Sequence, residues 1–127
     1  LSGCHVLKTV AWPSCITKIG AYALFKSAVA SADLSVYTSL RQIGNASFSA
    51  CNALETVALP PCIEELGERV LCGCPKLVTV DLGSCVSLRR IGHSAFCRCE
   101  SLESVVWPPN LEELGDGVAS GCPKLVA

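Results

Sequence analysis

Hydrophobic and small residues recur along this chain at an almost constant spacing. An Ile/Leu-Gly pair appears five times, with steps of 24, 23, 25 and 23 residues between copies. An apolar residue follows five positions later in each copy, and a Cys follows three positions after that in most copies. The pairs are Ile19-Gly20, Ile43-Gly44, Leu66-Gly67, Ile91-Gly92 and Leu114-Gly115. Self-similarity at a period of roughly 20 to 29 residues predicts a stacked repeat architecture.

Between these pairs lie short segments of the form Leu-x-x-Val, which we interpret as strands. In Leu54 to Leu59, the alternation of apolar and polar residues points Val57 and Leu59 inward and Thr56 and Ala58 outward. Because one repeat cannot bury its own apolar face, neighbouring copies must stack and share a core. We therefore expect parallel strands centred near five positions, Val10, Ala32, Val57, Val80 and Val105.

The remaining periodic positions complete the predicted coil. The Ile/Leu-Gly segments should form the wall opposite the strands, and the Phe/Leu positions before the Cys should close the corner. A Gly in all five copies suggests either a positive φ or a close approach of two backbones.

The repeat resembles that of the BspA-like leucine-rich repeats, whose unit reads roughly C-x-x-L-x-x-V-x-L-P and then L-x-x-I-G-x-x-A-F-x-x-C. The segments Cys51 to Pro60 and Ile91 to Cys99 match these two halves. The resemblance implies a leucine-rich-repeat solenoid that is mostly β, with parallel strands in a right-handed superhelix and short helical or 3-10 turns. Members include bacterial and protist surface proteins that bind host proteins or other cells, and the family pattern contains no catalytic residues.

We expect residues 1–127 to form a single solenoid domain of about five repeats of 23–25 residues, as a piece of a longer array. Neither end shows a polar capping repeat, which leaves room for end-to-end or assembly contacts. The net charge of -1 provides no basic stripe for nucleic acid, and no apolar run is long enough for membrane insertion.

The 10 Cys residues fall into three phases of the repeat. Cys51, Cys74 and Cys99 belong to the corner row, where Ser27 stands once, so we expect them to be buried and reduced. Two alternatives remain open for the Cys-x-Cys pairs at 72–74 and 97–99, which are inter-coil disulfides and a zinc site. Reliance on reduced Cys favours an intracellular setting, whereas the family resemblance favours the cell surface, so the localisation stays undetermined.

Catalytic and cofactor chemistry finds little support in the sequence. His5 and His93 occupy different repeat phases and should not meet. The carboxylate pairs Glu64-Glu65 and Glu112-Glu113 recur at one phase, which indicates a structural pattern. We therefore predict no enzyme, no cofactor and no metal.

The outward positions of the strands are the candidate site for a protein partner. They comprise Lys8, Thr9, Ser31, Asp33, Glu55, Thr56, Val78, Thr79, Asp81, Glu103, Ser104 and Val106. The competing interpretation is that the stacked Ser and Thr hydroxyls bond one another and serve the sheet alone. The function predicted is a protein-protein interaction module, adhesion-like, and the alternative is a structural or scaffolding subunit of a larger assembly.

Charged pairs before the Ile/Leu-Gly positions alternate in sign from coil to coil, from Glu64-Glu65 to Arg89-Arg90 to Glu112-Glu113. Stacked like charges would repel, whereas alternating charges attract. We expect an acid-base-acid ladder on the wall opposite the strands. The competing interpretation is that the Arg pair points into solvent and grips an acidic partner.

Overall fold

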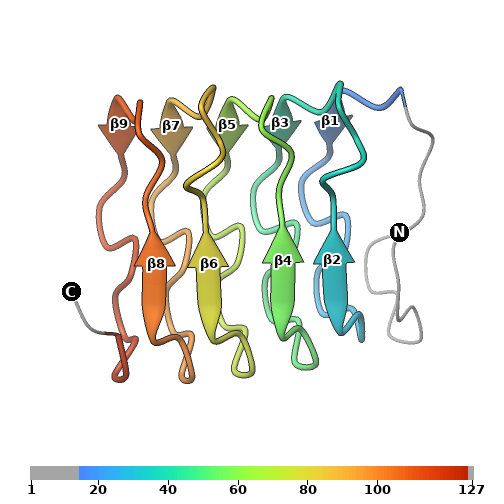
Figure 1. The fold of residues 1–127 in the computed structure, drawn as a ribbon. Coiled ribbons are helices and arrows are strands. Elements are labelled where there is room, and N and C mark those ends of the chain that lie inside the picture. The colour runs from blue at the N-terminus through green and yellow to red at the C-terminus, as the bar shows by residue number, and fades with distance from the viewer. Residues whose placement is uncertain (1–14, 126–127) are drawn as a thin grey trace.

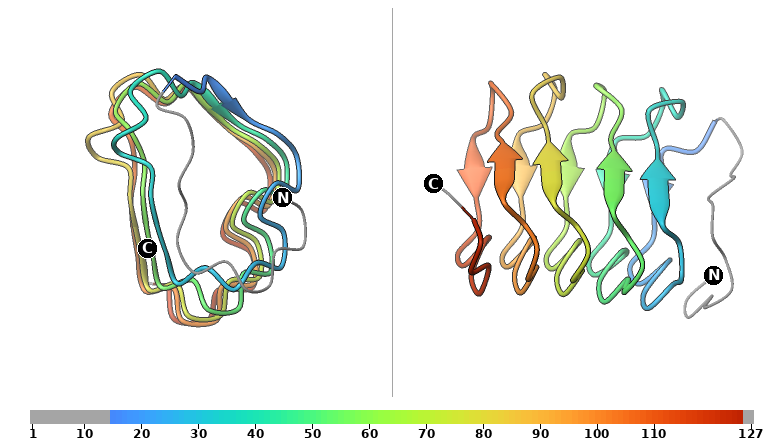
Figure 2. Two further views of the ribbon diagram at one scale, coloured as in Figure 1. Left: turned by 90° about the vertical axis from the view of Figure 1, so that its right-hand side faces the viewer. Right: turned by 60° about the horizontal axis from the view of Figure 1, so that its bottom comes forward.

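The computed structural model describes residues 15–125, which form a flattened coil with strands on two opposite walls (Figure 1). The strands are β1 (Lys18–Ile19), β2 (Ser31–Asp33), β3 (Gln42–Ile43), β4 (Thr56–Ala58), β5 (Glu65–Leu66), β6 (Thr79–Asp81), β7 (Arg90–Ile91), β8 (Ser104–Val106) and β9 (Glu113–Leu114). The view along the coil axis shows successive turns lying almost on top of one another (Figure 2). The predicted parallel β-solenoid is confirmed.

One wall carries the three-residue strands. β2 pairs with β4 and β6 pairs with β8, in both cases parallel and in the register that the repeat predicts, with Ala32 opposite Val57 and Val80 opposite Val105. Four of the five expected strand centres are therefore confirmed, and the fifth, at Val10, lies outside the described residues. The inward and outward alternation also holds, because Leu59 is buried and Val57 is half-buried against the core, while Thr56 and Ala58 are exposed.

The opposite wall is itself a parallel sheet, formed by the Ile/Leu-Gly segments in the order β1-β3-β5-β7-β9. Ile19, Ile43, Leu66 and Ile91 are each at most 4% exposed. The corner positions Leu24, Phe48, Leu71 and Phe96 are buried between the two walls. The core is thus a set of columns in which each side chain packs on its equivalents in the coils before and after it.

Close backbone approach explains the Gly of the Ile/Leu-Gly pair. A Cβ placed on Gly92 would lie 2.6 Å from the backbone nitrogen of Glu68 in the preceding coil, and Gly44 and Gly67 meet equally close backbone. Contacts this short do not occur for real Cβ atoms, so any larger residue would push two coils apart. The sequence suggests either a positive φ or a close approach of two backbones for this Gly, and the structure shows the close approach.

Left-handed backbone occurs instead two and six residues after that Gly. Every described coil has a positive φ, between 55° and 75°, at both positions. The first column is Tyr22, Ala46, Arg69, Ser94 and Gly117, and the second is Lys26, Ala50, Gly73, Arg98 and Gly121. Two left-handed residues four positions apart interrupt a right-handed helix in this part of each coil. Consistent with this, residues 15–125 contain turns but no helix, where short helical or 3-10 turns were expected.

The corner cysteines are buried as small apolar side chains, and their thiols also donate weak hydrogen bonds. Cys51, Cys74 and Cys99 are fully buried and form no disulfide. The Sγ of each donates to a corner carbonyl oxygen of the preceding coil, and the same contact is made by Cys122. These S–O distances are 3.2 Å from Cys51 to Leu24, 3.1 Å from Cys74 to Phe48, 3.1 Å from Cys99 to Leu71 and 3.0 Å from Cys122 to Phe96.

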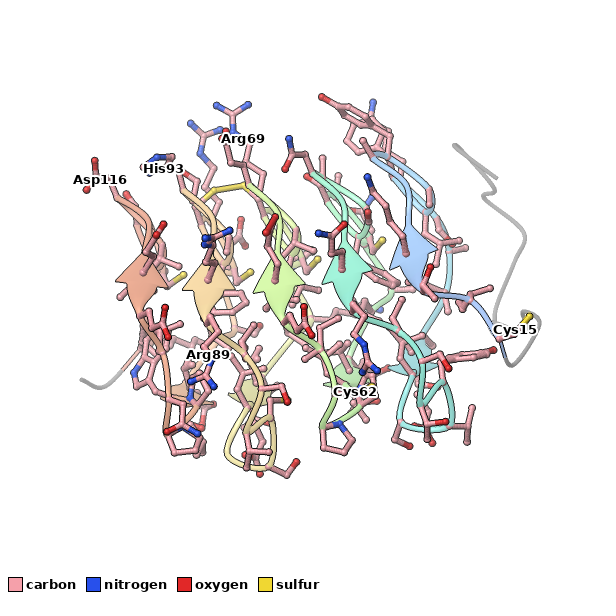
Figure 3. The ribbon with its side chains drawn as sticks, turned by 90° about the horizontal axis from the view of Figure 1, so that it is seen from above. Cys15, Cys62, Arg69, Arg89, His93 and Asp116 are labelled. Atoms are coloured by element: carbon pink, nitrogen blue, oxygen red, sulfur yellow. A yellow bond between two sulfur atoms is a disulfide. The ribbon has the colours of Figure 1, made fainter. Side chains whose placement is uncertain are left out.

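One disulfide joins neighbouring coils at a different phase. Cys72 and Cys97 are linked, with their Cα atoms 4.6 Å apart and a separation of 25 positions in sequence. In Figure 3, the bond between the two sulfur atoms lies close to Arg69. Of the alternatives left open for the two Cys-x-Cys pairs, an inter-coil disulfide is thus the one present. Cross-linking a loop of this length stabilises a fold by about 3 kcal/mol in the chain-entropy model.

Replacing Gly92 with Ala should lower the free energy of unfolding by about 1–3 kcal/mol, because the added methyl group forces two backbones apart. The matched reverse change, Ala50→Gly, should leave the stability equal to that of the native protein or higher, because it relieves a left-handed residue. Urea denaturation of both variants tests this. A Gly92→Ala variant as stable as the native protein would contradict the close-approach explanation.

Buried thiols should resist modification in the folded protein. Hydrogen bonding with the thiols of Cys51 and Cys99, together with burial, raises the pKa of Cys74, and burial with the nearby Asp81 carboxylate raises the pKa of Cys85 to about 11. A thiol reagent at pH 8 should label the exposed Cys15 rapidly and leave Cys74 and Cys85 unlabelled until urea is added. Peptide mass spectrometry reads the result, and rapid labelling of Cys74 in native buffer would refute it.

Candidate functional site

The predicted partner-binding face is the outer surface of β2, β4, β6 and β8. Lys8 and Thr9 lie outside the described residues. All ten other candidates are exposed, and they are Ser31, Asp33, Glu55, Thr56, Val78, Thr79, Asp81, Glu103, Ser104 and Val106. The register of the paired strands places Ser31 beside Thr56 and Thr79 beside Ser104, so the hydroxyls form a row across the wall. We call these ten residues the strand face.

No hydrogen bond joins the hydroxyls of Ser31, Thr56, Thr79 and Ser104 to one another within residues 15–125. The competing interpretation of this row, in which stacked hydroxyls bond each other, is therefore not what the structure contains. The hydroxyls remain available to a group outside the chain.

The charges of the strand face all have one sign. Asp33, Glu55, Asp81 and Glu103 are acidic, and the strand face contains no Lys or Arg. Val78 and Val106 add apolar surface, with exposed fractions of 39% and 49%. The strand face thus combines carboxylates, free hydroxyls and exposed Val side chains.

Two of these carboxylates also have a structural task. Oδ1 of Asp33 accepts hydrogen bonds from the backbone nitrogen and the hydroxyl of Ser35, and Oδ1 of Asp81 accepts from the backbone nitrogen of Gly83 at 2.9 Å. Each Asp thereby closes the turn that follows its strand. The hydrogen bonds from Ser35 lower the pKa of Asp33, which favours its charged form.

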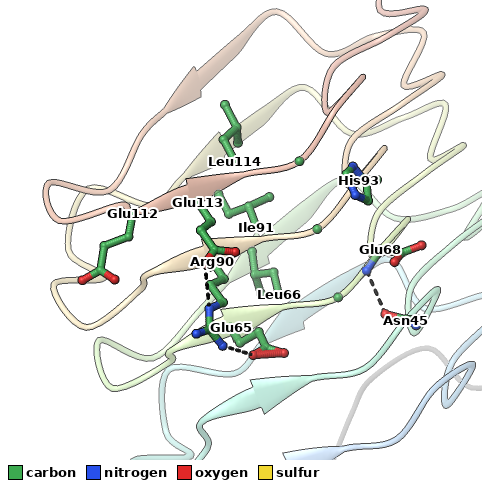
Figure 4. A pocket seen from close by; sticks show the side chains of 13 residues that line it. Asn45, Glu65, Leu66, Glu68, Arg90, Ile91, His93, Glu112, Glu113 and Leu114 are labelled. Carbon is green, nitrogen blue, oxygen red and sulfur yellow. Dashed lines mark hydrogen bonds and ion pairs between the residues drawn. The ribbon is translucent and has the colours of Figure 1, made fainter.

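The opposite wall bears the predicted charge ladder. Arg90 lies between Glu65 and Glu113, with nitrogen-to-oxygen distances of 3.6 Å to each (Figure 4). Arg89 pairs with Glu112 at 3.6 Å. The acid-base-acid alternation is confirmed for the Arg90 column, and the Arg side chains turn toward their Glu neighbours instead of leaving them for solvent.

The ladder extends one coil further than the sequence analysis indicated. Arg41 approaches Glu64 at 3.9 Å. It occupies the same repeat position as Glu64 and Arg89, two residues before the Ile/Leu, so the repeat alignment alone could have found it. The paired side chains are between 40% and 70% exposed, so each pair should contribute about 0–1 kcal/mol.

A hollow on the same wall contains His93, which was considered for catalysis (Figure 4). Its Nδ1 accepts a hydrogen bond from the backbone nitrogen of Asp116 at 2.8 Å. Oδ1 of Asn45, in an earlier coil, accepts from the backbone nitrogen of Glu68 in the same way. These side chains therefore connect adjacent coils, and nothing in this hollow pairs His93 with a nucleophile.

The described part of the chain contains neither a metal-binding cluster nor a membrane-spanning helix. Residues 15–125 bring no three His, Cys, Asp or Glu side chains together in a way that could hold a metal ion. Among the same residues, no helix is long and apolar enough to cross a membrane.

Comparison with known proteins identifies the repeat. Residues 17–127 match the family model described as the BspA type leucine rich repeat region, in six copies. No curated protein matches the chain.

Two solved structures share the fold. A leucine-rich repeat protein from Bacteroides ovatus ATCC 8483 superposes with a TM-score of 0.71 at 20% identity, over 96% of this chain and 37% of that one. The T. pallidum leucine rich repeat protein (TpLRR) gives a TM-score of 0.52 at 21% identity, over 94% of this chain and 78% of that one. The chain thus spans about a third of the length of the Bacteroides protein.

Reversing both ladder arginines, Arg89→Glu with Arg90→Glu, should lower the melting temperature at low salt, because three ion pairs become repulsive contacts. High salt should shrink the difference, since the pairs are exposed. The matched control is Arg69→Glu with Arg98→Glu, which changes the charge equally at two arginines outside the ladder. Equal melting temperatures for the reversed and native proteins at low salt would disprove the ladder's contribution.

Proposed function

This chain belongs to the BspA-type leucine-rich repeat family, a repeat scaffold of the protein-interaction type, and from that membership we propose a non-enzymatic binding module. The strand face is the contact surface, and its partner is a protein with a basic surface. The adhesion-like role that the family resemblance implies is part of this proposal.

The observation that carries the proposal is the composition of the strand face. Within residues 15–125, four carboxylates stand on it without a basic residue, and its hydroxyls make no bonds with one another, while Lys8 of the predicted face lies outside this range. Asp33 and Asp81 also close turns, whereas the side chains of Glu55 and Glu103 form no ion pair or hydrogen bond within residues 15–125, unlike the paired glutamates of the ladder on the other wall. An acidic face attracts Lys and Arg side chains of a partner and steers their approach.

The structural alternative is a scaffolding subunit of a larger assembly. Size-exclusion chromatography with light scattering separates the two proposals, because self-assembly should raise the apparent mass with concentration, whereas the mass of a monomeric binder should not change.

Affinity capture with the native protein and two charge variants, read by quantitative mass spectrometry, tests the strand face. The variant Glu55→Lys with Glu103→Lys reverses two of its carboxylates and should reduce capture of specific partners at least ten-fold. The control Glu68→Lys with Asp116→Lys makes the same charge change on the opposite wall and should retain them.

Captured partners should carry basic surfaces and should elute as salt is increased. If the Glu55 and Glu103 variant captures the same proteins as the control, in equal amounts, the strand face is not the contact surface.

A further inference from the structure

The five arginines of the chain fall into two groups. Arg41, Arg89 and Arg90 each pair with a glutamate of the ladder. Arg69 and Arg98 take part in no ion pair and no side-chain hydrogen bond within residues 15–125. They are therefore two guanidinium groups whose donors the described chain does not use.

These two arginines line the same hollow, although 29 positions of sequence separate them. The Cys72–Cys97 disulfide lies between their coils, with Arg98 directly after Cys97 and Arg69 three residues before Cys72. Figure 3 shows Arg69 beside the disulfide and extending away from the coil. The covalent link thus holds the two arginine-bearing coils at a fixed spacing.

The other polar groups of the hollow are hydroxyls, and none of the residues that line it is acidic. Ser94 and Ser120 make no side-chain hydrogen bond within the described residues. Ser49 differs, since its hydroxyl donates to the carbonyl oxygen of Cys72 at 3.0 Å. Two guanidinium groups and two hydroxyls without hydrogen-bond partners in the described chain are therefore gathered in a hollow that has no acidic residue in its lining.

Both arginines also occupy costly backbone positions. Arg69 has a φ of 56° and Arg98 a φ of 57°, and Gly stands at the same repeat positions in other coils, at Gly117 for Arg69 and at Gly73 and Gly121 for Arg98. A left-handed conformation costs a non-Gly residue roughly 1–2 kcal/mol. A similar φ occurs at Tyr22, Ala46, Ser94, Lys26 and Ala50, so the left-handed backbone belongs to the repeat. Because Gly also stands at both positions and neither arginine forms an ion pair or side-chain hydrogen bond within residues 15–125, the fold does not require arginine here.

We propose that this hollow binds a tetrahedral oxyanion, a phosphate or a sulfate, between Arg69 and Arg98. The planar guanidinium fork matches the oxygens of such a group and can donate two hydrogen bonds to it. The hydroxyls of Ser94 and Ser120 donate to the remaining oxygens. The hollow has a volume of about 410 Å³, which leaves room for an anion carried as an ester on a larger molecule.

The test is a titration of the isotope-labelled protein followed by NMR, at constant ionic strength, with sodium phosphate, sodium sulfate and phenyl phosphate as probes. Saturable shifts should appear at the amides of residues 69, 94, 98 and 120. Tighter binding of phenyl phosphate than of phosphate would identify an ester as the natural form, and the reverse order would identify the free ion.

The decisive variants are Arg69→Gly and Arg98→Gly, because the repeat itself places Gly at these positions. Each should bind the anions at least ten-fold more weakly while its melting temperature stays the same or rises, which separates loss of binding from loss of fold. Arg41→Gln, a ladder arginine outside the hollow, should bind as the native protein does.

Two results would overturn the proposal. One is the absence of saturable shifts with all three probes, and the other is unchanged affinity in both Gly variants. Neither result bears on the strand face, because none of the residues that line this hollow belongs to it.

Discussion

The spacing between coils, set by parallel backbone pairing, is the constraint on which the rest of this structure depends. β1, β3, β5, β7 and β9 pair in register, so every repeat position becomes a column of equivalent side chains. The side chains of each column must then fit the one distance between neighbouring coils. At Gly92 this distance leaves no room for a Cβ beside the backbone of Glu68, and in the apolar columns it lets each side chain pack on its equivalents.

The corner cysteines follow from the same constraint. A side chain at this position must be small, must be compatible with the apolar core, and lies within reach of a carbonyl oxygen in the coil before it. The thiols of Cys51, Cys74 and Cys99 meet all three conditions, with S–O distances of 3.1–3.2 Å. Ser27, which stands once in this row, is also small and also buried. Small size is therefore the first requirement at this corner position, and a weak hydrogen-bond donor is the second.

The same spacing divides the charged residues by what surrounds them. Where a column alternates in sign, as at Glu65, Arg90 and Glu113, neighbouring coils neutralise each other and the charges serve the fold. At Glu55 and Glu103 of the strand face and at Arg69 and Arg98 near the Cys72–Cys97 disulfide, no opposite charge within residues 15–125 forms an ion pair with the side chain. An acidic face on one wall and a pair of unpaired arginines in a separate hollow give this scaffold two surfaces of opposite charge.

The sequence by itself determined the repeat, the strand centres and their register, the two walls, the burial of the corner cysteines and the sign alternation of the ladder. Each of these properties belongs to a single column, and the members of a column are found by comparing residues that lie 23–25 positions apart in the sequence. The exposure of the ten described residues of the strand face follows from the same alternation, as Thr56 and Val57 illustrate.

Only the tertiary structure decided what happens between columns. The left-handed backbone at Arg69 and Arg98 and the meeting of those two arginines in one hollow depend on how the turn between columns folds. Cys72 and Cys97 share one repeat position, and only the structure decided between the disulfide and the zinc site that the sequence left open. Arg69 and Arg98 stand at different repeat positions in different coils, so no periodicity relates them. Their proximity comes from the path of the chain around the corner, and a repeat alignment contains no information about that path.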